Sequence, residues 1–145
     1  MKIFNQHTEL RPAPDWPEAI RDELGTNTLN GCVGQILVSE SERVRVWSLR
    51  LTPGERVPFH RHVLDYFWTV LTEGRARSHF GDGSTAEASY RAGDTKHMTY
   101  GAGEFMLHDL ENIGSTNLIF TTVEFLDSSN PALPLPERIK RAKAA

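Results

Sequence analysis

The feature that most constrains the fold of this chain is a series of short, apolar-rich segments separated by turn residues. Residues that favour chain reversal, chiefly Gly, Pro and Asp, gather at four places, namely residues 52–54, 72–74, 81–84 and 92–94. Between and beside these turns we expect strands at residues 33–38, 43–51, 66–71, 76–80, 98–100, 105–110 and 118–126. Seven short strands in under a hundred residues are typical of an all-β antiparallel sandwich or barrel.

The first part of the chain carries a helix signal instead. Residues 15–24 predict a short helix with Asp15 as its N-cap, Pro17 in its first turn and Gly25 as its stop. The length of 145 residues fits one domain. We therefore divide the chain into three parts: an N-terminal lead-in with a short helix (residues 1–31), a barrel (32–127), and a Pro-rich, basic C-terminal tail in solvent or in a short surface helix (128–145).

Composition excludes several classes of protein. Sixteen basic and nineteen acidic residues give a formal net charge of −3, which argues against a nucleic-acid partner. Polar residues interrupt every long apolar stretch, so we expect no membrane span, and the N-terminus lacks the apolar core of a signal peptide. The single cysteine, Cys32, permits no internal disulfide and fits a reducing compartment. We therefore expect a cytoplasmic protein.

Histidine is the residue from which this chain can build a metal site, because it has six histidines and one cysteine. His60 and His62 are two residues apart, so both project from the same face of an extended strand. His108 lies in a later predicted strand, which an antiparallel barrel can bring beside the first. Three imidazoles with open coordination positions suit a divalent transition metal that also binds water or substrate. The pair alone is a weak signal, since so short a motif also occurs by chance.

The context of the pair points to a family. The first conserved motif of the cupin superfamily resembles a pattern in this chain. Here Gly54 is followed after five residues by His60, then after one residue by His62, and at a distance by Gly74. The string HRHVLDY at residues 60–66 is similar to that of small cupins associated with beta-alanine degradation.

A second motif strengthens this resemblance. The end of the second cupin motif is similar to the segment in which His108 is followed after three residues by Asn112 and then by Gly114. Gly93 lies where that motif begins. The gap from Gly93 to His108 is longer than the pattern expects. The resemblance covers residues 32–126 and implies a small single-domain cupin, whose fold is an antiparallel double-stranded β-helix.

The chain departs from the first motif at one metal ligand. The family places a glutamate seven residues before the closing glycine, and counting back from Gly74 gives Phe67, which cannot bind a metal. Asp65 is the nearest carboxylate. Its side chain is short, and a strand position adjacent to the expected one faces the other way, so a bend would be needed to make it a fourth ligand.

Without the glutamate, the implied site holds its metal through histidine alone. Three neutral ligands leave a divalent ion its full charge, which favours an anionic or chelating substrate. Cupins with three-histidine iron include thiol dioxygenases and diketone-cleaving dioxygenases, a resemblance of ligand set only. Imidazole suits Fe, Ni, Zn and Cu, and the sequence does not distinguish among these and Mn.

Other residues have alternative roles. His97 could line the pocket or replace His108, but we expect a surface histidine or one that supports the ligands. Glu104 either supports the metal site or faces solvent. His79 alternates with two arginines, which predicts the solvent face of a strand. The expected pocket wall consists of Tyr66, Phe67 and Met106.

Three functions remain open from the sequence. The first is a metal-dependent enzyme that acts on a small organic molecule, with a dioxygenase-type reaction favoured. The second is a non-catalytic module that binds a small ligand, and the third is a metal-dependent isomerase or lyase; cupins serve in enzymes and in binding modules, so fold does not decide. We also expect a homodimer in which the N-terminal segment covers an edge strand.

Overall fold

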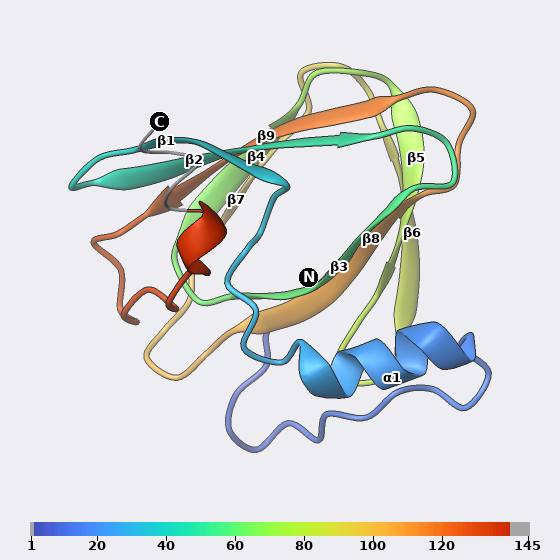
Figure 1. Ribbon diagram of the computed structural model, residues 1–145, viewed down its shortest axis with the longest axis horizontal. Helices are drawn as coiled ribbons and strands as arrows, with labels where there is room; N and C mark the ends of the chain where they lie inside the picture. Colours follow the sequence, from blue (N-terminus) through green and yellow to red (C-terminus); the bar gives the residue numbers. More distant parts are fainter. Residues whose placement is uncertain (1, 140–145) are drawn as a thin grey trace.

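The computed structural model describes residues 2–139 and is built mainly of β-structure (Figure 1). These residues form the helix α1 (Glu18–Thr26) and nine strands, and residues 137–139, at the end of the described range, are also helical. The strands are β1 (Ile36–Glu40), β2 (Val44–Leu51), β3 (Arg56–His62), β4 (Tyr66–Val70), β5 (Gly74–His79), β6 (Thr85–Tyr90), β7 (Thr95–Met98), β8 (Met106–Asn112) and β9 (Leu118–Phe125). No helix in this part of the chain is long and apolar enough to cross a membrane.

The strands form two antiparallel sheets that face each other across the interior of a barrel (Figure 1). One sheet has five strands in the order β1-β2-β9-β4-β7, and the other has four in the order β3-β8-β5-β6. Neighbours such as β2 with β9, and β3 with β8, are far apart in the chain. The prediction of an all-β antiparallel barrel with one short N-terminal helix is confirmed.

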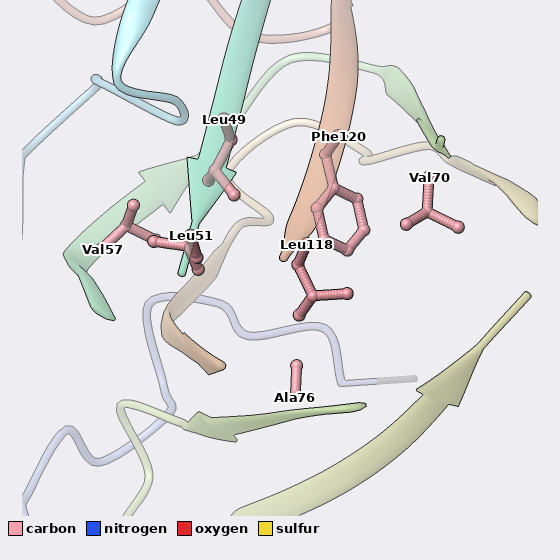
Figure 2. Packing of buried hydrophobic residues seen from close by; sticks show 7 residues of the cluster. All are labelled: Leu49, Leu51, Val57, Val70, Ala76, Leu118 and Phe120. Carbon is pink, nitrogen blue, oxygen red and sulfur yellow. The ribbon is translucent and has the colours of Figure 1, made fainter. Parts of the chain in front are cut away.

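An apolar core fills the barrel at the end where the two sheets come together. Strands β2 and β9 alternate buried and less buried residues, so one face of each points inward. The core cluster consists of Leu49, Leu51, Val57, Val70, Ala76, Leu118 and Phe120 (Figure 2). Because its members come from both sheets, this cluster fixes their spacing and leaves the rest of the interior free for polar residues.

A second apolar layer lies outside the barrel, between the four-stranded sheet and the N-terminal segment. Helix α1 lies along that sheet (Figure 1). The layer contains Phe4, Trp16, Leu24, Phe59, Phe105 and Leu107. Both faces of β3 and β8 are therefore buried, one by the barrel interior and one by the lead-in.

The helix differs from its prediction at both ends. It begins at Glu18 with Pro17 as N-cap, and no side chain caps it, so the predicted Asp15 cap is wrong. Trp16 is buried in the outer layer, and this packing shapes the chain just before the helix. The helix also continues through Gly25 to Thr26, and Gly25 lacks the positive φ with which a glycine would end it.

Most predicted strands match within a few residues, but the predicted list lacked two of the nine. β3 was considered extended only through the spacing of His60 and His62, and β6 was missed altogether. Its burial pattern shows exposure along nearly its whole length, so its sequence lacks the apolar alternation that predicts a strand. It forms through six residue pairs with β5. Pairing with a neighbour, and not burial, makes this segment extended.

The C-terminal tail does not lie free in solvent over its described part. Leu135 is buried against Val33, Leu37 and Trp47 at one end of the barrel. This contact corrects the solvated alternative for that stretch, whereas the other alternative, a short helix, agrees with the helical residues 137–139. Much of the basic end, residues 140–145, lies outside the described residues.

Candidate metal centre

A β-bulge in β3 turns both histidines of the pair toward the barrel interior. Val57 pairs with Leu110 and His60 pairs with His108, so two residues of β3 stand opposite one residue of β8. Proline has no N–H to donate to the ladder, and Pro58 is one of the two bulged residues. The bulge lets Val57 and His60 face the same side although they are three residues apart.

The three predicted histidines converge. The ring centroids of His60 and His62 are 4.9 Å apart, those of His60 and His108 are 4.7 Å apart, and those of His62 and His108 are 5.2 Å apart. Each offers one ligand nitrogen, and these atoms all lie within 4.8 Å of one another. The Nε2 atoms of His62 and His108 are 3.3 Å apart. Two nitrogens bound at about 2.1 Å to one ion, at roughly 90–110°, would be about 3.0–3.4 Å apart, which fits this spacing.

Hydrogen bonding fixes the orientation of the His60 ring, whereas one nitrogen of the His62 ring lacks a partner among the described residues. The Nδ1–H of His60 donates to the carbonyl oxygen of Pro58 at 2.8 Å, which leaves Nε2 of His60 with its lone pair for a metal. Nδ1 of His62 is buried and has no hydrogen-bond partner among the described residues. The ring of Tyr66 stacks on His62 at 4.2 Å.

All three imidazoles are neutral near pH 7. Burial lowers the pKa of His60 to about 4. Burial, and then repulsion from neighbouring imidazoles, lowers the pKa of His62 and of His108 well below the usual value. A metal ion binds the unprotonated ring, so this set of donors suits a divalent transition metal without first losing protons.

The histidines line a small inner cavity of about 80 Å³ that adjoins an outer groove of about 450 Å³. The inner cavity has an apolar and aromatic wall with few polar groups. Its lining consists of Val33, Leu49, His60, His62, Tyr66, Trp68, Ser78, Tyr90, His108, Leu110, Phe120 and Thr122. This lining includes no carboxylate and no lysine or arginine. The groove shares five of these residues and adds Met106, together with Lys2, Lys96 and Glu87 at its rim.

Two of the residues considered as further ligands lie elsewhere. Asp65 accepts a hydrogen bond from the backbone N–H of Tyr100 at 2.9 Å and does not belong to the histidine cluster. His97 is exposed on β7, with its ring 5.2 Å from that of Phe67. His97 therefore does not replace His108, and Asp65 does not complete the site.

The pocket role predicted for Phe67 is wrong. Its ring packs against His97 and Phe125 on the outward face of the five-stranded sheet. Side chains alternate along a strand, so the inward position next to it is Tyr66, which lines both cavities. Tyr66 thus stacks on a histidine near the place where the family motif predicts a glutamate.

Glu104 and His79 also take positions that the metal site does not use. Glu104 accepts the N–H of Gly101 at 2.6 Å and closes a tight turn. His79 is buried, which corrects its predicted solvent exposure: the outer face of its sheet is covered by the N-terminal segment. Its Nδ1–H donates to the fully buried carboxylate of Asp109 at 2.9 Å.

Sequence reasoning missed one buried acid inside the barrel. Glu124 lies on β9 with 3% of its surface exposed and accepts the Nε1–H of Trp47 at 2.7 Å. Burial raises its pKa to about 7. Its position continues the inward series Leu118, Phe120 and Thr122 at a spacing of two, and this alternation was the available signal.

Comparison with known proteins identifies the class of fold to which this structure belongs. No protein-family model matches the chain, and no curated protein does. The chain is similar to a cupin domain from Bordetella pertussis Tohama I, with a TM-score of 0.53 and 25% identity over 60% of this chain and 85% of that chain. It is also similar to an uncharacterized conserved protein with a double-stranded β-helix domain from Klebsiella pneumoniae, with a TM-score of 0.50 and 28% identity over 69% of this chain and 75% of that chain. The fold is the cupin double-stranded β-helix, with a cluster of three histidines inside the barrel.

Proposed function

We propose that this protein binds one divalent transition metal ion through His60, His62 and His108 and acts on a small organic anion bound at the open side of that ion. The observation that carries the proposal is the convergence of three buried, neutral imidazoles at one end of a cavity. The Nε2 atoms of His62 and His108, 3.3 Å apart, have the spacing that two ligands of one ion would have.

The charge of the site supports an anionic substrate. Three neutral ligands would leave an ion with two positive charges uncompensated, and no carboxylate lines the inner cavity. The substrate must then supply the negative charge, as a carboxylate or another oxygen chelate does. Lys96 at the groove rim attracts the same class of molecule, whereas Lys2 at that rim is paired with Asp82 at 3.1 Å.

The wall of the cavity supports a compact substrate with an apolar body. Trp68, Tyr90 and Phe120 meet edge to face, with centroid distances of 5.2 to 5.5 Å. Such a wall excludes water and strengthens electrostatic interactions at the site. Ser78 and Thr122 contribute aliphatic hydroxyl groups that can orient a polar substituent.

We favour a dioxygenase-type reaction, because the ligand set resembles that of three-histidine iron cupins. A redox-active ion would supply the activation of oxygen, while the chain holds the substrate, keeps the ligand rings neutral and excludes bulk water. Residues 60–66 resemble those of small cupins associated with beta-alanine degradation, and we propose a place among them. On separate grounds, the single cysteine and the need to cover an edge strand, we propose a homodimer in the cytoplasm. A non-catalytic binding module and a metal-dependent isomerase or lyase remain the alternatives.

Elemental analysis of the purified protein tests the metal site. We expect about one transition metal ion per chain in wild type and loss of most of it in His60→Ala and in His108→Ala. His97→Ala is the matched control, because this histidine is exposed outside the cavity and its variant should keep the metal. Absence of metal from wild type, or retention by the two ligand variants, contradicts the proposal.

Oxygen uptake separates the three functions. With iron loaded, a dioxygenase consumes oxygen when a panel of small carboxylates is added, and with zinc loaded it does not. An isomerase or lyase converts substrate in both forms without oxygen, whereas a binding module shows ligand-dependent thermal stabilisation without turnover.

A further inference from the structure

The backbone of the bulge in β3 is held by side chains from the N-terminal lead-in. β3 is an edge strand of its sheet, and Phe59 within the bulge has no ladder partner. Its N–H donates to Oε2 of Glu23 at 2.9 Å. Its carbonyl oxygen accepts from Nδ2 of Asn27 at 3.1 Å and from Nδ2 of Asn30 at 2.9 Å.

From these contacts we propose that Glu23, Asn27 and Asn30, together the bulge clamp, are positioning residues for the metal centre. This inference rests on the proposed function, because it assigns these residues a role in the affinity of that same site. None of the three touches the cavity. They act through the peptide groups that precede His60.

The clamp acts on the ligand through two adjacent peptides. Phe59 lies between Pro58, whose carbonyl accepts the Nδ1–H of His60, and His60 itself. Rotation of the Phe59 peptide would tilt that carbonyl and the imidazole together. Holding both the N–H and the carbonyl of Phe59 removes this freedom. Groups hydrogen-bonded directly to metal ligands typically change affinity by about 10- to 100-fold, and the clamp acts through the backbone on such a group, the carbonyl of Pro58.

An ion network extends the clamp to the second ligand strand. Arg56 donates to both carboxylate oxygens of Glu23, at 2.6 and 3.0 Å, and to Asp109 at 2.9 Å. Asp109 directly follows His108 and also accepts the backbone N–H of His79 at 2.6 Å. One set of contacts outside the barrel thus links the strands that carry His60 and His108.

The lead-in also buries apolar surface, so a purely structural role must be separated from positioning. Phe4 provides the matched control. It is buried in the same outer layer, where its ring packs 5.8 Å from that of Phe105, and it makes no hydrogen bond to the bulge. Removal of its ring weakens the attachment of the lead-in and leaves the clamp in place.

The test compares full-length Asn27→Ala/Asn30→Ala with Phe4→Ala and wild type. We expect the dissociation constant for Co²⁺, measured by competition with a chelator, to rise by about 10- to 100-fold in the double variant, with an altered visible spectrum of the bound ion. Phe4→Ala should unfold at a lower temperature yet bind Co²⁺ within about twofold of wild type. If the double variant does not fold, Asn30→Ala alone should show a smaller rise in the same direction.

A second readout needs no metal. In the metal-free protein, proton NMR should detect a slowly exchanging Nδ1–H on His60 in wild type and in Phe4→Ala, and rapid exchange of that proton in the double variant. A wild type that binds no Co²⁺ overturns the proposed function. Unchanged Co²⁺ affinity in the double variant, or an unchanged His60 proton in it, overturns the clamp.

Discussion

Burial sets the charge of individual side chains inside this barrel. The pKa of His60 is lowered to about 4, and the pKa of Glu124 is raised to about 7. Both shifts have desolvation as their largest cause, because burial disfavours the charged form of an acid and of a base alike. Between about pH 5 and 6 both groups are therefore largely uncharged, and a bound metal ion would dominate the electrostatics of the interior.

Glu124→Gln should make the protein more stable at high pH. Because the folded pKa of Glu124 lies above the unfolded value of 4.5, the native state binds more protons than the unfolded state between these values, and wild-type stability falls as pH rises through them. Glutamine has no such proton to lose and can still accept from Trp47. We expect a gain of roughly 1–3 kcal/mol at pH 8 and little gain at pH 5.

Urea unfolding at the two pH values measures this difference. Glu42→Gln, at an exposed position before β2, should show no dependence of this kind. A Glu124→Gln variant that is less stable than wild type at pH 8 would mean that the carboxylate is charged and well compensated in the folded state.

At the scale of elements, the barrel depends on close approaches that only small residues permit. Gly74, which closes the first cupin-like motif, begins β5. A Cβ atom there would lie 2.6 Å from Cδ2 of Leu118, a fully buried member of the core cluster (Figure 2). The motif glycine is thus explained by packing of β5 against β9, and not by the metal site.

Gly74→Ala should destabilise the fold by about 1–3 kcal/mol through overpacking. Combination with Leu118→Ala should cost less than the sum of the two single changes, because the shorter side chain removes the clash. Gly25→Ala is the control: no atom lies within 4 Å of its added Cβ, and alanine favours the helix by up to about 1 kcal/mol. Additive effects of Gly74→Ala and Leu118→Ala in urea unfolding would contradict this account.

At the scale of the whole molecule, the three histidines couple the stability of the metal-free fold to pH. The pKa of each is lower in the folded protein than the ordinary value of 6.5. The unfolded state therefore binds more protons, and stability is lost as pH falls from about 6.5 toward 4. His60 alone contributes about 3 kcal/mol to this loss.

We expect the free energy of unfolding of the chelator-treated protein to fall steeply between pH 6.5 and 4.5. Glu124 acts in the opposite direction over the same range, but one carboxyl is outweighed by three imidazoles. His60→Ala should flatten the dependence, and His97→Ala should leave it unchanged. A wild-type stability that is constant or rises on acidification would show that these rings are charged in the folded state.

Local patterns predicted a large part of this protein. Turn residues and apolar alternation marked most strands, and the spacing of His60 and His62 placed both rings on one face. These properties depend on the period of an extended chain, which is a local quantity. Alternation distinguishes two faces of a strand without saying which one is inside, and for this reason Phe67 was assigned to the pocket that Tyr66 lines.

The contacts between distant segments, and the burial that they cause, were decided by the tertiary structure alone. The pairing of His60 with His108, the burial of His79 and Asp109 beneath the lead-in, and the bulge clamp all join segments distant in the chain. Burial and pKa follow from such contacts, since desolvation depends on what covers a side chain and not on its neighbours in sequence. The residue types of the three-histidine cluster are therefore properties of the sequence, whereas the convergence and the neutrality of its rings result from the packing of the whole fold.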